Sequence, residues 1–500
     1  MKQTFFRCSA GALALCALHA CSDPISDVQI ETWEPEIAAP IINTSFTLRD
    51  ALDQTNFSDY LSEDEDSGLR LTLDQKIFDV RPASSVNVPN LLVPLLDTVT
   101  RYNLADEDLD FGLNKAQFTD GYILYRFTND KTETVTVDVT TPSFMSDGLP
   151  LRGILTIPAG ETLADSVPAS LYEMDLGDEG EVVVDYSATT SSGEQVKLIF
   201  GAISLSSVDF NYAEGTLAAL DVDLGQDSIE LDMLEVFEEG SIELVDATAK
   251  LIVSNEVGVP FAISTTESVA NLRDGSVAVF NSPLSEGFAF DYPSMAEGQT
   301  AKTSELIIDN TTSNFVEVIN KFPTQLKMNL LGQANPEDLQ ERFFIHRDAR
   351  LSGRIELDMP LAVRFNGFEI NEEFAFDGSS LAEAIEAAFV LNVDNGFGLQ
   401  AQVQVYFKDD AGVTIDSLFP ALTEIIASAE VDELGATLSS TQLRTEIELP
   451  SDRLAALSAS RAASVKLRLF SPEEGAQVTR LYYDNRLGVQ LGARVTTRPF

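Results

Sequence analysis

Cysteine and histidine are nearly absent from this sequence of 500 residues. Its three cysteines, Cys8, Cys16 and Cys21, all lie at the start, and its two histidines are His19 and His346. A fold stapled by disulfides and a cysteine-ligated zinc site are therefore excluded, and histidine-based metal chemistry has too few ligands. A Ser-His-Asp triad would depend on His346, and no Gly-x-Ser-x-Gly motif exists. We interpret His346 as a packing or surface residue.

Cations are the second shortage. The chain has 32 Lys and Arg against 80 Asp and Glu, which gives a net charge of −48. Such a charge repels phosphate backbones and anionic headgroups, so it excludes nucleic acid as a partner and a basic patch that binds an anionic bilayer. We expect a solvated acidic surface; the alternatives are acids that bind Ca²⁺ or a basic partner.

Two acidic stretches, "ADEDLDFG" (105–112) and "DVDLGQD" (221–227), have spacings that suggest Ca²⁺ ligands. The first departs from the EF-hand pattern, because Gly112 comes one residue late and Gln117 stands where a glutamate is needed. We expect no other cofactor. The candidate metal ligands are Asp106, Asp108, Asp110, Asp221, Asp223 and Asp227.

The first residues have the pattern of a secretory signal, with a basic start and an apolar run too short to span a bilayer. The run ends in "LHAC" (18–21), which resembles the lipobox of bacterial lipoproteins. That resemblance implies cleavage before Cys21 and acylation of this residue, with chains such as palmitate. Ser22 as the next residue implies, by the same resemblance, the outer membrane. We therefore expect a signal peptide over 1–20 and a lipid anchor on Cys21.

Alternation of apolar and polar residues dominates the rest of the chain. Examples are "YILYRF" (122–127), "ETVTVDV" (133–139) and "LQAQVQVYF" (399–407), with Gly, Ser, Asn and Asp clusters between such runs. Helical patterning is confined to 94–103, 380–389 and 451–463. We predict a mainly β protein of several antiparallel β-sandwich, immunoglobulin-like modules with a few short helices.

One pattern recurs four times: an alternating strand reaches an asparagine, turns, and a second strand follows. It occupies 122–139, 249–264, 315–328 and 388–407, with Asn129, Asn255, Asn320 and Asn395 at the turns. We favour ordinary turn chemistry, because Asn tolerates the left-handed region and bonds its own backbone. The alternative is a ligand loop repeated on several modules.

Three stretches resemble uncharacterised lipoproteins of the Bacteroidota: "WEPEIAAPIINTSFTLRDAL" (33–52), "LIVSNEVGVPFAI" (251–263), and the tail from "LNVDNGFGLQAQVQVYF" through "LPSDRLAAL". The repeated units are also similar to the small β-sandwich of late-embryogenesis-abundant proteins, as a fold-level analogy. Neither resemblance brings functional residues. Composition places a polar tether at 21–34, an N-terminal region at 35–118, β modules at 119–210 and 211–345, and a C-terminal β module at 346–500.

From these features we expect a non-enzymatic binding or structural role in the cell envelope. The membrane is reached through the lipid on Cys21, and the partner is a protein or a hydrophobic ligand. One alternative is a carrier of lipid or another hydrophobe, which needs an elongated apolar groove. The other is a glycan-binding or glycan-hydrolysing lipoprotein, and hydrolysis needs a pair of carboxylates.

Overall fold

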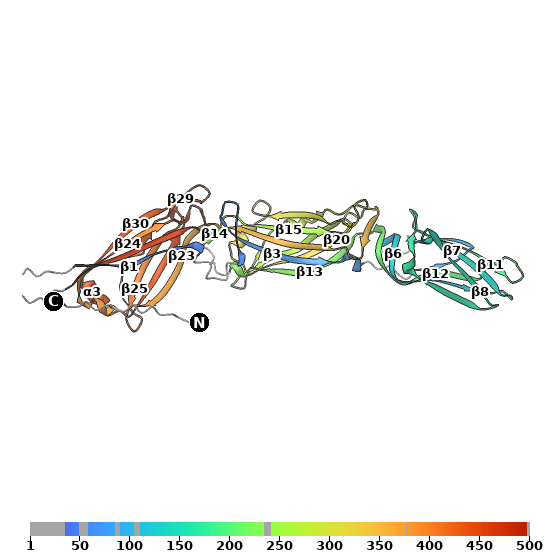
Figure 1. Ribbon diagram of the computed structural model, residues 1–500, viewed down its shortest axis with the longest axis horizontal. Helices are drawn as coiled ribbons and strands as arrows, with labels where there is room; N and C mark the ends of the chain where they lie inside the picture. Colours follow the sequence, from blue (N-terminus) through green and yellow to red (C-terminus); the bar gives the residue numbers. More distant parts are fainter. Residues whose placement is uncertain are drawn as a thin grey trace, which may run out of the picture.

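Antiparallel sheets build three modules that follow one another along a rod (Figure 1). The computed structural model describes residues 36–49, 59–85, 91–104, 111–234, 242–376 and 378–497. We call the three parts the terminal, middle and distal modules, in order from the end that holds the first and last strands. The prediction of a mainly β fold with several antiparallel sheets is confirmed.

The terminal module packs a four-stranded sheet on a larger one. The four-stranded sheet has the order β1 (Glu36–Thr47), β33 (Arg486–Thr497), β24 (Ala384–Asn395) and β30 (Thr441–Leu449). The larger sheet contains β14 (Ile242–Leu244), β23 (Ala362–Ala375), β31 (Ala462–Phe470), β25 (Gln400–Lys408), β26 (Thr414–Ser417), β27 (Thr423–Ile426) and β32 (Thr479–Arg480). A small hairpin adds β28 (Glu430–Val431) and β29 (Thr437–Ser439).

The middle module is a sandwich of two five-stranded sheets. One contains β19 (Lys302–Ile308), β15 (Thr248–Asn255), β22 (Leu351–Pro360), β3 (Leu69–Val80) and β2 (Leu61–Glu63). The other contains β13 (Leu220–Glu230), β20 (Gln325–Ala334), β16 (Phe261–Asn271), β17 (Val277–Val279) and β18 (Phe288–Phe290).

The distal module is one ten-stranded sheet built around two long strands, β6 (Phe111–Thr128) and β12 (Phe200–Leu217). Register shifts in this pair between Ser206 and Tyr212 curve the sheet around its core. The other strands are β21 (Phe343–His346), β10 (Glu173–Asp175), β7 (Val135–Ser146), β11 (Glu181–Thr190), β5 (Val99–Asn103), β4 (Leu92–Pro94), β8 (Leu149–Ile157) and β9 (Thr162–Pro168).

The chain runs out along the rod and back. β1 pairs with β33 in the terminal module, β3 pairs with β22 in the middle module, and β6 to β12 form the far end (Figure 1). Strands of the N-terminal region predicted at 35–118 therefore contribute to all three modules, because antiparallel pairing does not require neighbours in sequence. The boundaries drawn from composition stay a prediction, and strand pairing runs across them.

Helices are few in the described ranges, and two of the three expected ones are strands. Residues 94–103 hold the end of β4 and all of β5, and most of 380–389 belongs to β24, because pairing with neighbouring strands overrides local helix propensity. The third begins as expected with α3 (Ser451–Leu457). The second α-helix, α2 (Phe315–Ile319), replaces a predicted strand. Short 3₁₀ turns occupy Pro82–Ser85, Ala169–Leu171, Asp232–Leu234, Pro283–Glu286, Gly378–Glu383 and Glu473–Gly475.

The asparagine pattern is one buried corner repeated once in each module. Asn129, Asn255 and Asn395 are each at most 1% exposed. In each, the side-chain oxygen accepts a hydrogen bond of 2.9 Å from the backbone N–H two residues on. The fourth, Asn320, follows α2 and bonds the backbone of Leu244 instead. The favoured interpretation, turn chemistry, accounts for these bonds.

Hydrophobic packing is distributed unevenly along the rod. One continuous cluster of buried side chains extends through the middle and distal modules and reaches the terminal module, where Ile242, Leu244, Val363 and Phe365 on β14 and β23 belong to it. The terminal module has its own small cluster, which draws on both of its sheets and on α3. Its buried members are Ala387, Phe407, Leu449, Leu454, Leu457 and Ala463.

Backbone pairing and ion pairs hold the two joints of the rod. At the terminal–middle joint, the N–H of Leu69 donates to the carbonyl of Leu481 at 2.9 Å. Asp64 there forms an ion pair with Arg480, and the two side chains are only 14% and 18% exposed. Gly68 leaves room for the arginine beside them, because a Cβ would lie 2.4 Å from Nε of Arg480 and would displace this side chain.

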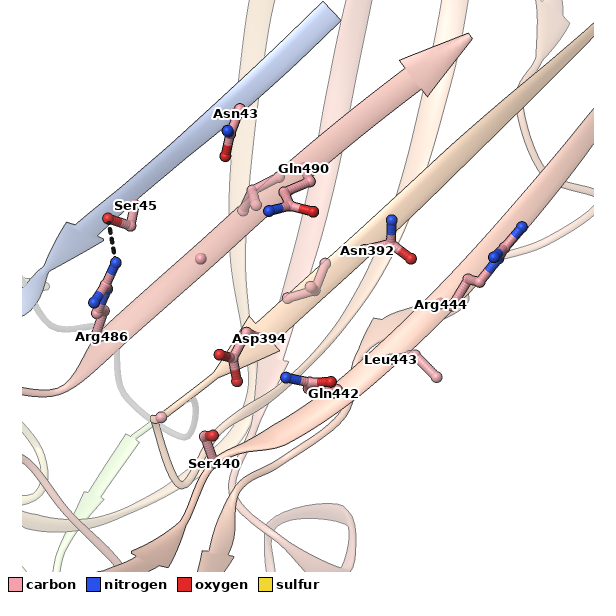
Figure 2. Close-up of a pocket in the computed structure, with 14 residues that line it drawn as sticks. Asn43, Ser45, Asn392, Asp394, Ser440, Gln442, Leu443, Arg444, Arg486 and Gln490 are labelled. Atoms are coloured by element: carbon pink, nitrogen blue, oxygen red, sulfur yellow. Dashed lines mark hydrogen bonds between the residues drawn. The ribbon is translucent and has the colours of Figure 1, made fainter. Parts of the chain in front are cut away.

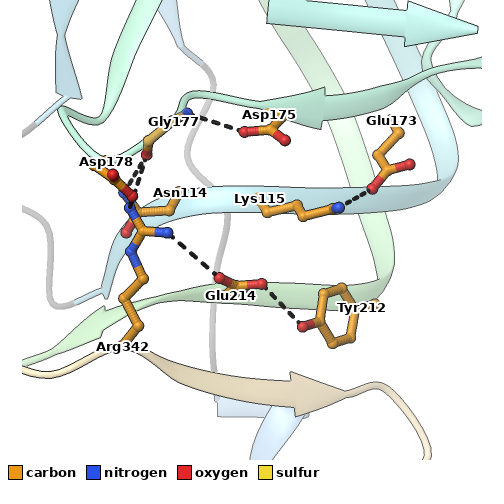
Figure 3. A network of polar contacts seen from close by, with 9 residues as sticks. All are labelled: Asn114, Lys115, Glu173, Asp175, Gly177, Asp178, Tyr212, Glu214 and Arg342. Atoms are coloured by element: carbon orange, nitrogen blue, oxygen red, sulfur yellow. Dashed lines mark hydrogen bonds and ion pairs between the residues drawn. The ribbon is translucent and has the colours of Figure 1, made fainter. Parts of the chain in front are cut away.

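At the middle–distal joint, the N–H of Phe344 on β21 donates to the carbonyl of Gly258 at 3.3 Å, and the ring of Phe344 covers Gly258, where a Cβ would lie 2.1 Å from a ring carbon. Figure 3 shows the polar network next to it. Arg342 bonds Asp178 at 2.6 Å and lies 3.6 Å from Glu214, and Glu214 accepts a hydrogen bond of 3.1 Å from Tyr212. Both joints therefore connect their modules through specific bonds.

Candidate functional site

Several predicted site residues lie outside the described residues: Cys21, Asp106, Asp108 and Asp110. Asp221 and Asp223 lie exposed on β13, where Asp221 accepts a hydrogen bond of 3.3 Å from Gln333; Asp227 belongs to the same strand. The described part of the chain holds no group of three His, Cys, Asp or Glu side chains placed to bind a metal ion.

His346 lies at the end of β21, where its ring packs against Tyr212 with 5.0 Å between ring centroids. Burial lowers the pKa of His346. Its neighbour Arg347 forms an ion pair with Asp209. These contacts fit the interpretation of His346 as a packing residue.

The most distinctive polar surface is the outer face of the four-stranded sheet in the terminal module. Its side chains line a hollow of about 690 Å³, which we call the large hollow (Figure 2). Two rows of directly paired residues cross all four strands: Asn43, Gln490, Asn392 and Arg444 in the first, and Ser45, Gly488, Asp394 and Gln442 in the second.

Period-two alternation explains why these side chains gather. On a strand every second residue faces the same side, so polar residues at alternate positions of four neighbouring strands meet on one face. Val393 and Leu443 stand between the polar positions, and Val393 is buried. Gly488, in one of the two inner strands, brings no side chain and leaves the floor of the large hollow open.

Most of these polar groups have no partner in the part of the protein that the structure describes. In the residues that the structure describes, no hydrogen bond or ion pair engages the side chains of Asn43, Gln490, Asn392, Asp394 or Gln442. All five are exposed. Their donors and acceptors are therefore free for a ligand in place of water.

Arginines lie at both sides of the large hollow. Arg486 donates a hydrogen bond of 3.0 Å to the hydroxyl of Ser45, and it has no carboxylate partner among the described residues (Figure 2). Arg444, on the opposite side, lies 3.6 Å from Glu446. Asp394 is the single carboxylate in the described lining. The arrangement can donate and accept hydrogen bonds, but it lacks the carboxylate pair that glycoside hydrolysis uses.

Sequence reasoning did not find this site. "LNVDN" (391–395), "TQLRTE" (441–446) and "RLGVQLGA" (486–493) were interpretable as ordinary strands with one solvated face. The one available signal was that the polar positions are amides as often as charges, although Asp and Glu dominate the composition. Which strands lie side by side depends on pairing between residues more than 400 positions apart, as in β1 with β33.

No helix in the described ranges is long and apolar enough to cross a membrane.

No protein-family model matches the chain, and no curated sequence matches it. A protein from Parabacteroides distasonis ATCC 8503 that is thought to be secreted matches in structure, with 11% identity over 57% of this chain and 89% of that one and a TM-score of 0.34. The CBM22-1-CBM22-2 tandem domain of Xyn10C from Paenibacillus barcinonensis matches at 10% identity over 57% and 87%, with a TM-score of 0.14. TM-scores this low carry no argument about fold or function.

Proposed function

We propose that this chain is a non-enzymatic binding protein of the cell envelope, held by a lipid on Cys21, and that the large hollow binds an uncharged, hydroxyl-rich ligand such as a glycan. The observation that carries the proposal is the double row of polar side chains across four strands, most of them without a partner among the described residues.

Amide side chains suit such a ligand, because each carries both donors and acceptors and can bond neighbouring hydroxyl groups. Asn43, Gln490 and Asn392 stand side by side on three adjacent strands, and strands lie about 4.8 Å apart. The charges beside them balance, since Arg444 and Arg486 accompany Asp394 and Glu446, and Glu446 lies 3.6 Å from Arg444. A neutral polar surface in a strongly acidic protein favours a neutral polar ligand.

Two other functions fit the same surface less well. A carrier of lipids needs apolar walls, whereas the described lining of the large hollow is mostly amide, hydroxyl and charged groups. A hydrolase needs two carboxylates about 5–10 Å apart, and this lining has Asp394 alone. Binding without turnover is what the present side chains support best.

Affinity electrophoresis tests ligand binding. The protein runs in gels that contain one of four neutral polysaccharides: starch, β-1,4-glucan, mannan or xylan. We expect at least one to retard it. The double variant Asn392→Ala with Gln490→Ala should lose about ten-fold in affinity through two missing hydrogen bonds. Gln195→Ala, an exposed amide of the distal module, serves as the control. Equal mobility in all four gels would contradict the proposal.

Cell fractionation tests the anchor. Cys21 precedes Glu36 by 15 positions, a length of chain that spans at most about 50 Å, so an anchor there keeps the terminal module near the membrane. Cys21→Ala should move the protein from the membrane fraction to the soluble fraction and abolish labelling with palmitate. Cys16→Ala, inside the expected signal peptide, should change neither. Membrane retention of the Cys21 variant would refute the lipid anchor.

A further inference from the structure

The outer face of the four-stranded sheet extends beyond the large hollow. A second hollow of about 460 Å³, which we call the small hollow, is lined by Glu386, Ala388, Glu448, Arg494 and Thr496, among others. These residues lie on the same three strands, β24, β30 and β33, that form most of the large hollow.

The pairing register places both hollows on one face. Along β24, Asp394 and Asn392 line the large hollow, and Ala388 and Glu386 line the small one. All four are even-numbered positions of one continuous strand, so their side chains face the same side. Arg494 of β33 is directly opposite Ala388, just as Gln490 is opposite Asn392.

An ion pair crosses the floor between the two hollows. Arg494 of β33 binds Glu446 of β30, and the small side chain of Ala388 on β24 lies between those strands. Arg494 is 48% exposed and Glu446 is 37% exposed. Arg444, from the large hollow, lies 3.6 Å from the same glutamate. The crossing is therefore a polar floor that a ligand can contact.

We propose that the two hollows are parts of one groove that binds a linear, uncharged polysaccharide lengthwise along the strands, with Arg494 and Glu446 at its middle. The inference rests on the proposed function and names the class of glycan. From Arg486 to Thr496, β33 spans about 33 Å at roughly 3.3 Å per residue, a length that exceeds any mono- or disaccharide.

Charge on the groove supports a neutral polymer. Three arginines, Arg444, Arg486 and Arg494, accompany four acids, Asp394, Glu386, Glu446 and Glu448. This near balance contrasts with the 32 cations and 80 acids of the whole chain. A polyanion such as a polyuronate would gain little from three arginines beside four carboxylates and would meet the net charge of −48.

Calorimetric titration with a disaccharide and a hexasaccharide of whichever polysaccharide retards the protein tests the groove. The hexasaccharide should bind roughly ten-fold or more tightly, because it forms additional hydrogen bonds beyond the large hollow. Arg494→Ala should remove this advantage, because it should weaken the hexasaccharide much more than the disaccharide. Asn392→Ala, in the large hollow, should weaken both ligands.

Circular dichroism shows whether each variant is folded, and Arg494→Lys is a matched variant that keeps the charge. Together they separate a loss of binding from a loss of folding. Equal affinity for the two chain lengths would overturn the groove and leave the proposed function intact. If folded Arg494→Ala lost affinity equally for both ligands, the single groove would also be refuted and the proposed function would remain. If none of the four polysaccharides retards the wild-type protein, the proposed function fails, and the groove fails with it.

Discussion

The terminal and distal modules use the same buried asparagine corner, yet they present opposite surfaces. In the terminal module the outer face of β1, β33, β24 and β30 is polar. In the distal module, β4 exposes Leu92 at 59%, β6 exposes Tyr122 at 51% and β12 exposes Phe200 at 41%. The shared corner therefore specifies how strands turn, and the alternate positions of each strand specify what the module can contact.

Their interiors differ as well. The distal module shares one hydrophobic cluster with the middle module, whereas in the terminal module the buried members of that cluster lie on β14 and β23, and a separate cluster there has six buried side chains. Burial of apolar surface is the main favourable term in folding, so we expect the terminal module to open at a lower free energy than the rest. The candidate binding face thus belongs to a sheet whose strands β24 and β30 pack on the smaller of the two clusters.

The largest predicted effect comes from removing a corner asparagine. Nδ2 of Asn395 donates to the carbonyls of Phe397, Leu399 and Ala427 at 2.8–3.1 Å, and Asn129 has an equivalent set of bonds. Asn395→Ala leaves these buried carbonyls unpaired and should cost about 3 kcal/mol or more. Hydrogen exchange should show lost protection in the terminal module only, whereas Asn129→Ala should weaken the distal and middle modules together.

Asn392→Ala, three residues earlier on the same strand and exposed, is the matched control and should change stability by no more than about 0.5 kcal/mol. If Asn395→Ala lowered protection evenly along the whole chain, the rod would be a single cooperative unit, and the difference between the two modules would disappear.

The fold class was accessible from the sequence because alternation is a local signal. The alternating stretches 122–127, 133–139 and 399–407 lie mostly within β6, β7 and β25, although β6 and β7 extend well beyond them. The asparagine corners were visible for the same reason. The failures were short segments, 94–103, 315–319 and 380–389, where tertiary pairing or packing decides between strand and helix.

The candidate site was not accessible in the same way. Its rows join β1 to β33 and β24 to β30, and no local pattern states which strands become neighbours. Single residues such as Asn392 or Gln442 look like ordinary solvated positions until the register aligns them. The acidic stretches, by contrast, were conspicuous in the sequence, yet Asp221 and Asp223 stand on an exposed strand outside any three-ligand cluster in the described part.

A smaller effect is predicted at the terminal–middle joint. Burial opposes ionisation of Asp64, but hydrogen bonds from the N–H of Gly68 and from Arg480 hold its pKa below the ordinary value. Arg480→Met removes the partner of a largely buried carboxylate and should cost about 2 kcal/mol in chemical denaturation. The pKa of Asp64 should rise. A carboxyl whose pKa is lowered by folding stabilises the fold at pH values above its ordinary pKa, and this stabilisation is lost as the pH falls through the lowered pKa. The variant lacks this contribution, so it should lose less stability than the wild type on acidification.

Lys197→Met is the control for that joint, since its ion pair with Asp97 is 54% and 71% exposed and should contribute about 0.5 kcal/mol or less. Equal losses in the two variants would mean that the joint bond is no stronger than a surface pair. The terminal module would then be connected to the rod by backbone pairing alone.

The smallest predicted effect is a titration at the middle–distal joint. Burial, together with the charge of Glu214, raises the pKa of Tyr212 from 10.0 to about 12. Folding therefore favours the neutral phenol, and this stabilisation is complete below pH 10 and is lost as the pH rises through 12.

Glu214→Gln should lower the Tyr212 pKa but leave it above 10.0, because burial remains. Tyr125, whose pKa burial and Asp165 also raise to about 12, is the internal control. Ultraviolet titration of tyrosinate should show a lower pKa for Tyr212 in this variant and an unchanged pKa for Tyr125. If neither moved, the Glu214 charge would not act on Tyr212, and the network in Figure 3 would hold the joint by hydrogen-bond geometry alone.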